Sequence, residues 1–205
     1  MKEKIKSLTE TYFQEILSIR RYLHMIPETG CNEYKTADFI IEKLKEYGIA
    51  YLSGVAKTGI VGIISGKNPK SKIIALRADM DALPIHEANQ VDYKSKNEGV
   101  MHACGHDVHM ACLLGAAKIL NEIKNEFNGS VKLFFQPSEE KFPGGARVMI
   151  DEGVLENPTV THVFGQHVLP ELEVGKVGLK AGKYMASTDE IYLTIQGVAA
   201  CPPFP

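Results

Sequence analysis

The sequence predicts an α/β layered domain, and three observations support this prediction. Apolar segments with helical spacing alternate with short apolar, β-branched segments along most of the chain. This alternation is typical of domains in which helices cover a sheet. The length of 205 residues accommodates one to two domains of ordinary size. Polar residues follow the C-terminal ends of several predicted strands, which is where open α/β sheets place their ligands.

Four segments have the apolar spacing of amphipathic helices. In residues 7–26, apolar side chains recur every three or four positions up to Pro27, which ends a helix. Residues 36–47 have the same spacing and lead to Gly48, a residue suited to a C-terminal cap. Residues 106–123 and 144–152 are the other two predicted helices.

Short apolar runs predict the strands. They lie at residues 60–65, 73–76, 131–135 and 160–165, and we expect the last to be buried. Residues 190–196 alternate between apolar and polar, which predicts one more strand with a single buried face. The tail after it contains Pro202, Pro203 and Pro205, and proline cannot donate to a sheet ladder. No later segment therefore offers that strand a partner.

Composition excludes several classes of protein. A hydrophobic content of 44% and a formal net charge of −2 are ordinary for a globular chain and unlike a disordered one. Four cysteines are too few for a small disulfide scaffold, and near neutrality gives no general reason to expect nucleic acid. No segment has the length of a membrane span, and the N-terminus lacks the apolar core of a signal peptide. We therefore expect a cytoplasmic protein with reduced thiols and no nucleic-acid or membrane partner.

The densest chemical signal is M-H-A-C-G-H-D-V-H at residues 101–109. It contains three of the seven histidines and one of the four cysteines. Imidazole and thiolate are preferred ligands of zinc and similar divalent ions. The alternative is that these residues only cap and pack the helix that begins near His106. Because histidine and cysteine occur together in a glycine-containing turn, the cluster as a whole favours metal binding.

Three further signals follow predicted strands. Glu139 and Glu140 are adjacent carboxylates, of which one could bind metal and the other act as a general base, although a solvated acidic turn has the same pattern. Asp79 and Asp81 could orient a ligand, contact a metal or form a turn. His167 is weak evidence by itself. Four strand-end sites of matching chemistry favour a common metal centre.

The motifs, in their order along the chain, resemble the M20 metallopeptidase family. They are R-A-D-M-D-A-L-P at 77–84, M-H-A-C-G-H-D at 101–107, Q-P-S-E-E at 136–140 and G-Q-H-V at 165–168. The chain is most similar to the amidohydrolase branch, which cleaves N-acyl amino acids, hippurate and auxin conjugates. R-R-Y-L-H-M-I-P-E at 20–28 resembles the N-terminal signature of that branch. The resemblance extends from about residue 12 to residue 197.

The resemblance implies a zinc-peptidase-like catalytic domain on a central mixed sheet, with a small-molecule N-acyl amino acid as substrate. It implies two divalent metal ions, with zinc favoured and nickel, manganese and cobalt as alternatives. Glu139 would be the general base toward the attacking water, and Asp81 would orient a ligand from behind. The acyl group and the amino acid stay open. The implied metal ligands are Cys104, His106, Glu140 and His167.

The sequence departs from the family after residue 197. Members continue with a G-G-H-G-like segment, a lid or dimerisation domain and a later histidine ligand, whereas no histidine follows His167 here. This favours a truncated or frameshifted, C-terminally incomplete version of such an enzyme. We expect residues 1–187 to form the catalytic part and residues 188–205 a strand stub with an off-pattern tail. Full-length relatives are expected to be homodimers or larger. This chain is expected to be poorly soluble or to self-associate, because some apolar surface should be exposed.

The incomplete chain leaves two functional hypotheses. One is an active amidohydrolase, and the other is an inactive fragment that still binds metal. A structural metal module is less consistent with paired carboxylates, because structural zinc sites are usually closed by four cysteines or histidines.

Overall fold

The structure is a computed structural model that describes residues 1–186 and 191–197. The chain divides into two units, residues 1–168 and residues 169–205. All helices and strands of the described part lie in the first unit. They are α1 (Lys2–Met25), α2 (Tyr34–Glu46), β1 (Ala50–Val55), β2 (Gly59–Ser65), β3 (Ile73–Asp79), α3 (His106–Glu122), the short 3₁₀ helix η1 (Lys124–Glu126), β4 (Ser130–Gln136), α4 (Gly145–Asp151) and β5 (His162–Gly165).

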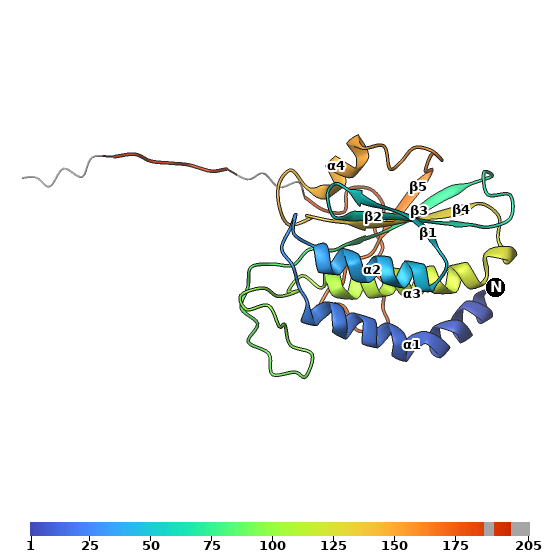
Figure 1. Cartoon of the computed structure of the whole chain (residues 1–205), viewed down its shortest axis with the longest axis horizontal. Helices are drawn as coiled ribbons and strands as arrows, with labels where there is room; N and C mark the ends of the chain where they lie inside the picture. Colours follow the sequence, from blue (N-terminus) through green and yellow to red (C-terminus); the bar gives the residue numbers. More distant parts are fainter. Residues whose placement is uncertain (187–190, 198–205) are drawn as a thin grey trace, which may run out of the picture. The chain divides into compact units, whose positions relative to one another are not determined.

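The strands form one mixed sheet in the order β1-β2-β4-β3-β5 (Figure 1). The mixed character of the sheet was expected from the sequence. The β1–β2 and β2–β4 pairs are antiparallel, whereas β3 runs parallel to both β4 and β5. The register pairs Asp79 with Gln136 and Arg77 with Gly165. The carboxyl ends of β3, β4 and β5 therefore meet at one edge of the sheet, and the polar segments that follow them start there.

Helices cover both faces of this sheet. Figure 1 shows α1, α2 and α3 on one face and α4 on the other. Successive side chains of a strand point to opposite faces, and β4 serves both cores. Leu133 and Phe135 pack in the cluster formed with α1, α2 and α3. Phe134 packs on the opposite side against Met149 and Val154. The predicted α/β layering is confirmed.

Three sequence expectations differ from the structure. Strand β1 was not predicted, because most of its residues are exposed and its sequence, A-Y-L-S-G-V, is interrupted by Ser53 and Gly54. Strand β5 is exposed at all four positions, so the expectation of a buried strand was wrong. It lies at the end of the sheet, where nothing in the described part pairs with its outer side.

The predicted strand at 190–196 is also wrong over its described residues, 191–196, which are exposed and not in a strand. A strand is stable only within a sheet, and the described sheet does not include residues 191–196. The tail at 198–205 lies outside the described residues. The expected division at residue 187 adjoins residues that are not described, and it stays a prediction.

The second unit contains turns in its described part. The amide of Leu172 donates to the carbonyl of Leu169, and that of Lys176 donates to the carbonyl of Glu173, each at 3.0 Å.

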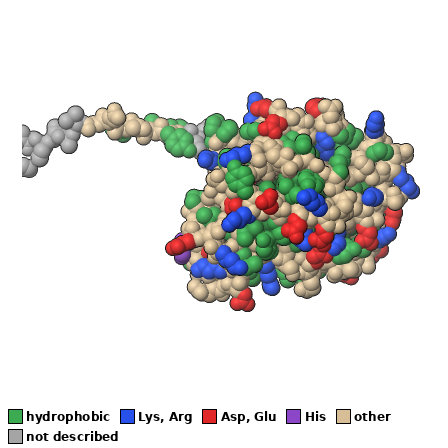
Figure 2. Space-filling view, in the orientation of Figure 1, with side chains coloured by type: hydrophobic (Ala, Val, Ile, Leu, Met, Phe, Trp, Pro, Cys, Tyr) green, Lys and Arg blue, Asp and Glu red, His purple; other side chains and the backbone are tan. Residues whose placement is uncertain are grey.

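Among the described residues, no helix is both long and apolar enough to cross a membrane. On the face shown in Figure 2, acidic and basic side chains are intermixed, in keeping with the formal net charge of −2.

Candidate metal centre

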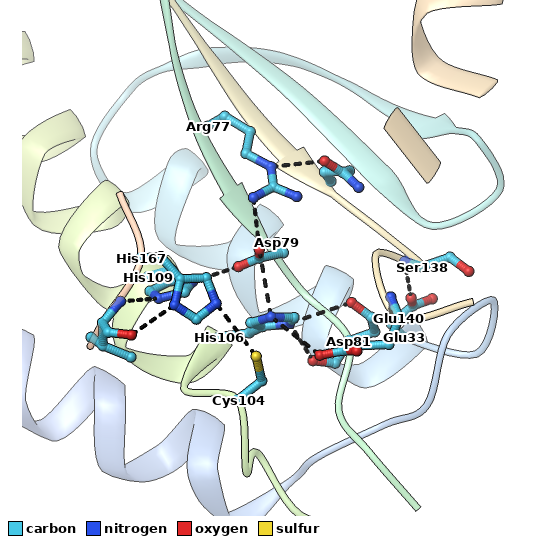
Figure 3. Close-up of polar contacts among 12 residues, drawn as sticks. Glu33, Arg77, Asp79, Asp81, Cys104, His106, His109, Ser138, Glu140 and His167 are labelled. Carbon is cyan, nitrogen blue, oxygen red and sulfur yellow. Dashed lines mark hydrogen bonds and ion pairs between the residues drawn. The ribbon is translucent and has the colours of Figure 1, made fainter. Parts of the chain in front are cut away.

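The residues singled out in the sequence come together where the parallel strands end (Figure 3). Asp79 is the last residue of β3, and Asp81 lies two positions further on. Glu139 and Glu140 follow β4, and His167 follows β5. Cys104 and His106 stand at the beginning of α3. Between them, Gly105 adopts a φ of 90°, a left-handed conformation that glycine accepts without strain.

His106 is the centre of this cluster. Three groups of side chains each hold their ligand atoms within 4.8 Å of one another, and His106 belongs to all three. Its Nε2 is buried without a hydrogen-bond partner. It lies 3.5 Å from an Asp79 carboxylate oxygen and 3.7 Å from one of Glu140. The three groups are Cys104 with His106 and His167, Asp79 with His106 and His109, and His106 with Glu139 and Glu140.

The four predicted ligands are thereby brought into one region. Cys104 Sγ lies 3.4 Å from His167 Nε2, and both belong to a group with His106. Glu140 approaches the Nε2 atom of His106, at 3.7 Å. The side chain of His106 is buried, whereas Glu139, Glu140 and His167 are exposed at the surface. The cluster therefore borders the surface of the described part.

Asp81 fixes the orientation of two of these groups. His106 Nδ1 lies 2.8 Å from the Asp81 main-chain carbonyl and 3.4 Å from its carboxylate. Since a carbonyl only accepts, Nδ1 donates its proton to it, and in the neutral ring this leaves the Nε2 lone pair facing the cluster. The Asp81 carboxylate also accepts the Glu140 amide N–H at 2.9 Å. Asp81 therefore contacts His106 on the ring nitrogen that faces away from the cluster, and it contacts Glu140 at its main chain.

The electrostatics of the cluster suit a divalent cation. Burial, reinforced by Glu140, raises the pKa of Cys104 to about 12, so its thiol stays protonated at neutral pH. Burial also raises the pKa of Glu139, and the neighbouring charge of Glu140 adds to this effect. A thiol becomes a ligand by losing its proton, and a nearby metal ion favours that loss. The donor set, with an unpartnered imidazole nitrogen in its centre, therefore fits divalent metal.

His109 and Asp79 form a contact that the sequence pattern did not predict. His109 Nδ1 lies 2.6 Å from Asp79, and His109 Nε2 accepts the Val168 amide N–H at 3.0 Å. Burial opposes ionisation of Asp79, but His109 and Arg77 outweigh it and lower the pKa to about 2. His109 therefore holds the main chain next to His167. Its position three residues after His106 on the same helix was the available signal.

The fold and the site together define an α/β domain with a candidate centre for more than one divalent ion. Residues 75–201 match the peptidase family M20/M25/M40. The chain belongs to this family.

Two curated relatives and one solved structure illustrate the similarity. The N-acyl-L-amino acid amidohydrolase of Geobacillus stearothermophilus is 43% identical over 196 residues, covering 96% of this chain and 52% of the relative. The hippurate hydrolase of Campylobacter jejuni is 45% identical over 89% of this chain and 47% of its own length. A Bacillus subtilis structure described as a dinuclear metal-binding peptidase of the M20 family has a TM-score of 0.79 at 40% identity, covering 84% of this chain and 48% of that one. The chain thus spans about half the length of the relatives it matches.

Proposed function

We propose that this chain carries the metal centre of an amidohydrolase that cleaves the amide bond of N-acyl amino acids. The observation that supports this most is the cluster around His106. Its Nε2 atom is buried without a hydrogen-bond partner, and Cys104, Glu140 and His167 lie around it. The relatives named above, an N-acyl-amino acid amidohydrolase and a hippurate hydrolase, support the same reaction class.

Two divalent ions would be held by these four side chains, and zinc suits the thiolate and imidazoles best. When bound, such ions polarise the scissile carbonyl and make water a better nucleophile near neutral pH. Asp81 would keep His106 in the tautomer that offers Nε2. His109 would keep His167 in place through the Val168 amide.

Glu139 is the proposed general base. Its carboxylate makes no hydrogen bond to another residue of the described part, so its oxygens are free for water and substrate. The raised pKa brings it nearer to the working pH, which suits a group that both accepts and returns a proton. Glu139 would take a proton from the attacking water and deliver it to the departing amine.

A second candidate function is metal binding without turnover. It is favoured by the length of the match, because the chain corresponds to about half of each relative. The match covers 52% of the Geobacillus stearothermophilus relative and 47% of the Campylobacter jejuni relative.

A hydrolysis assay with matched variants separates the two functions. The zinc-loaded chain should release amino acid from N-acetyl amino acids or hippurate. Glu139→Gln should lower kcat about 10²- to 10⁴-fold, since general acid–base catalysis contributes that much. Glu98→Gln, an exposed change outside the cluster, should leave the rate unchanged. Bound zinc without turnover in the unmodified chain would favour the second function, and absence of both zinc and turnover would overturn the proposal.

A further inference from the structure

A buried carboxylate outside the metal centre contacts the loop that carries Glu139 and Glu140. Glu33 precedes α2 and has an exposed fraction of 0%. Its two oxygens accept hydrogen bonds from two different segments, the main-chain N–H of Ser138 and the hydroxyl of Thr58, each at 2.7 Å. No lysine, arginine or histidine of the described part forms an ion pair with it. Hydrogen bonds alone therefore hold this carboxylate.

The residue that Glu33 holds is in a strained conformation. Ser138 has a φ of 51°, a left-handed value that is uncommon for residues other than glycine. It directly precedes the two glutamates, so its backbone angles set the direction in which the chain presents them. A strained residue persists only where its surroundings determine it, and the Glu33–Ser138 hydrogen bond is one such restraint.

Close packing restrains the same loop on its other sides. A Cβ on Gly145 would lie 1.8 Å from the Pro137 carbonyl, and a Cβ on Gly30 would lie 2.8 Å from Ser138 Oγ. The Gly145 amide donates to the Ser138 carbonyl at 2.9 Å. Asp81 accepts the Glu140 amide. The loop is thus held at Ser138 by Glu33 and at Glu140 by Asp81 (Figure 3). Glu139 lies between these two positions in the sequence.

We propose that Glu33 is a positioning residue for the paired glutamates. It acts through the Ser138 amide and touches neither metal nor substrate. This inference rests on the proposed function, in which Glu140 is a metal ligand and Glu139 a base. It predicts that the acceptor oxygen at position 33, rather than its charge, places these two side chains.

Three variants test this proposal. Glu33→Ala removes both hydrogen bonds and leaves the Ser138 amide without a partner. Glu33→Gln keeps an oxygen for Ser138 and offers an amide group to Thr58. Glu28→Ala is the matched control, because Glu28 accepts the amides of Lys35 and Thr36 at the start of the same helix and does not contact the loop. All three would be compared with the unmodified chain.

The two readouts are zinc affinity by competition with a chelating dye and hydrogen exchange of the peptide over residues 136–141. Glu33→Ala should weaken zinc binding about 10- to 100-fold, as loss of groups behind metal ligands does. It should also speed exchange of that peptide beyond its effect elsewhere. Glu33→Gln should restore both readouts, and Glu28→Ala should change neither, although it lowers stability.

Unchanged zinc affinity and unchanged exchange in Glu33→Ala would overturn the inference and leave the proposed function intact. Equal effects of Glu28→Ala and Glu33→Ala would also overturn it, because both would then reflect stability alone. If the unmodified chain bound no zinc, the proposed function would fail. The exchange of residues 136–141 would then still decide whether Glu33 holds the loop.

Discussion

His24 is a single buried residue that connects three segments of the fold beside the proposed metal centre. Its side chain is 4% exposed, and its two ring nitrogens face two carboxylates, Asp107 at 2.7 Å and Glu87 at 3.1 Å. A histidine donates from both nitrogens only when protonated. The hydrogen bond to Asp107 is the main cause that raises the His24 pKa, and it outweighs burial. The contact joins α1, the start of α3 and the segment that contains Glu87.

This network predicts a pH-dependent stability. Since folding raises the pKa of His24, protonated His24 stabilises the folded state. This stabilisation is complete below the unfolded-state pKa of 6.5 and is lost as pH rises through the folded-state pKa. Burial opposes ionisation of Glu87 and Asp107, but their hydrogen bonds lower both pKa values. The ionised Glu87 and Asp107 stabilise the folded state above their unfolded-state pKa values of 4.5 and 3.8. This stabilisation is lost as pH falls through their lowered folded-state pKa values. The stabilisation is therefore greatest between pH 4.5 and 6.5.

His24→Asn should lower the free energy of unfolding by about 1–3 kcal/mol in that range, because it leaves buried carboxylate oxygens without one of their hydrogen-bond donors. Arg20 still pairs with Asp107 at 2.9 Å. The difference from the unmodified chain should shrink as pH is raised toward 9. Urea unfolding of metal-free protein at several pH values measures this. His162→Asn, the same change at an exposed histidine, is the control. A pH-independent difference would show that His24 is not protonated in the folded state.

Some of the site residues could be predicted from the sequence, and others could not. Glu140 and His167 lie in short motifs that follow strands, and Cys104 and His106 lie in a motif that begins a helix, so local pattern and family resemblance both indicate them. Glu33 and His24 act through partners 25 to 105 positions away. Asp79 was singled out in the sequence, but its contact with His109, 30 positions away, was not. Nothing in the local sequence reports such a partner, and only the folded chain brings the two together.

At the scale of elements, hydrophobic periodicity predicted the helices and strands of residues 1–168 that pack against neighbouring elements. The four α-helices and strands β2, β3 and β4 follow from it, with ends displaced by a few residues, whereas β5 was located correctly but wrongly expected to be buried. Periodicity fails at sheet edges, because burial there depends on whether another strand arrives. Strand β1 was missed for this reason, and residues 191–196 alternate without being in a strand.

Strand β4 should contribute most to stability, because all of its residues are buried. Leu133 has an exposed fraction of 0% in the central strand, whereas Leu52 in the edge strand β1 is 63% exposed. Leu133→Ala should lower the free energy of unfolding by about 2–5 kcal/mol, through lost burial and a cavity. Leu52→Ala should change it by less than about 0.5 kcal/mol. Chemical denaturation compares them, and equal losses would contradict the assigned core.

At the scale of the whole chain, strand β5 leaves apolar side chains in contact with solvent. Val163 and Phe164 are 51% and 55% exposed on a strand that ends the described sheet. Unpaired edges and apolar patches favour association between chains. Sedimentation velocity at increasing concentration should therefore show species larger than a monomer. Phe164→Lys should reduce them, and Phe13→Lys on α1, where Phe13 is also 55% exposed, should not. A monodisperse monomer at all concentrations would contradict this.

The proposed metal centre is tested most directly by the metal content of the purified chain. Zinc-loaded protein, dialysed against metal-free buffer and analysed by mass spectrometry of the elements, should retain two ions per chain. Cys104→Ser should retain fewer, because a hydroxyl is a poor substitute for a thiolate toward zinc. Cys112→Ser, at an exposed cysteine outside the proposed ligand set, should retain as many as the unmodified chain. An unmodified chain without zinc, or a Cys104→Ser variant with full content, would contradict a metal centre at these strand ends.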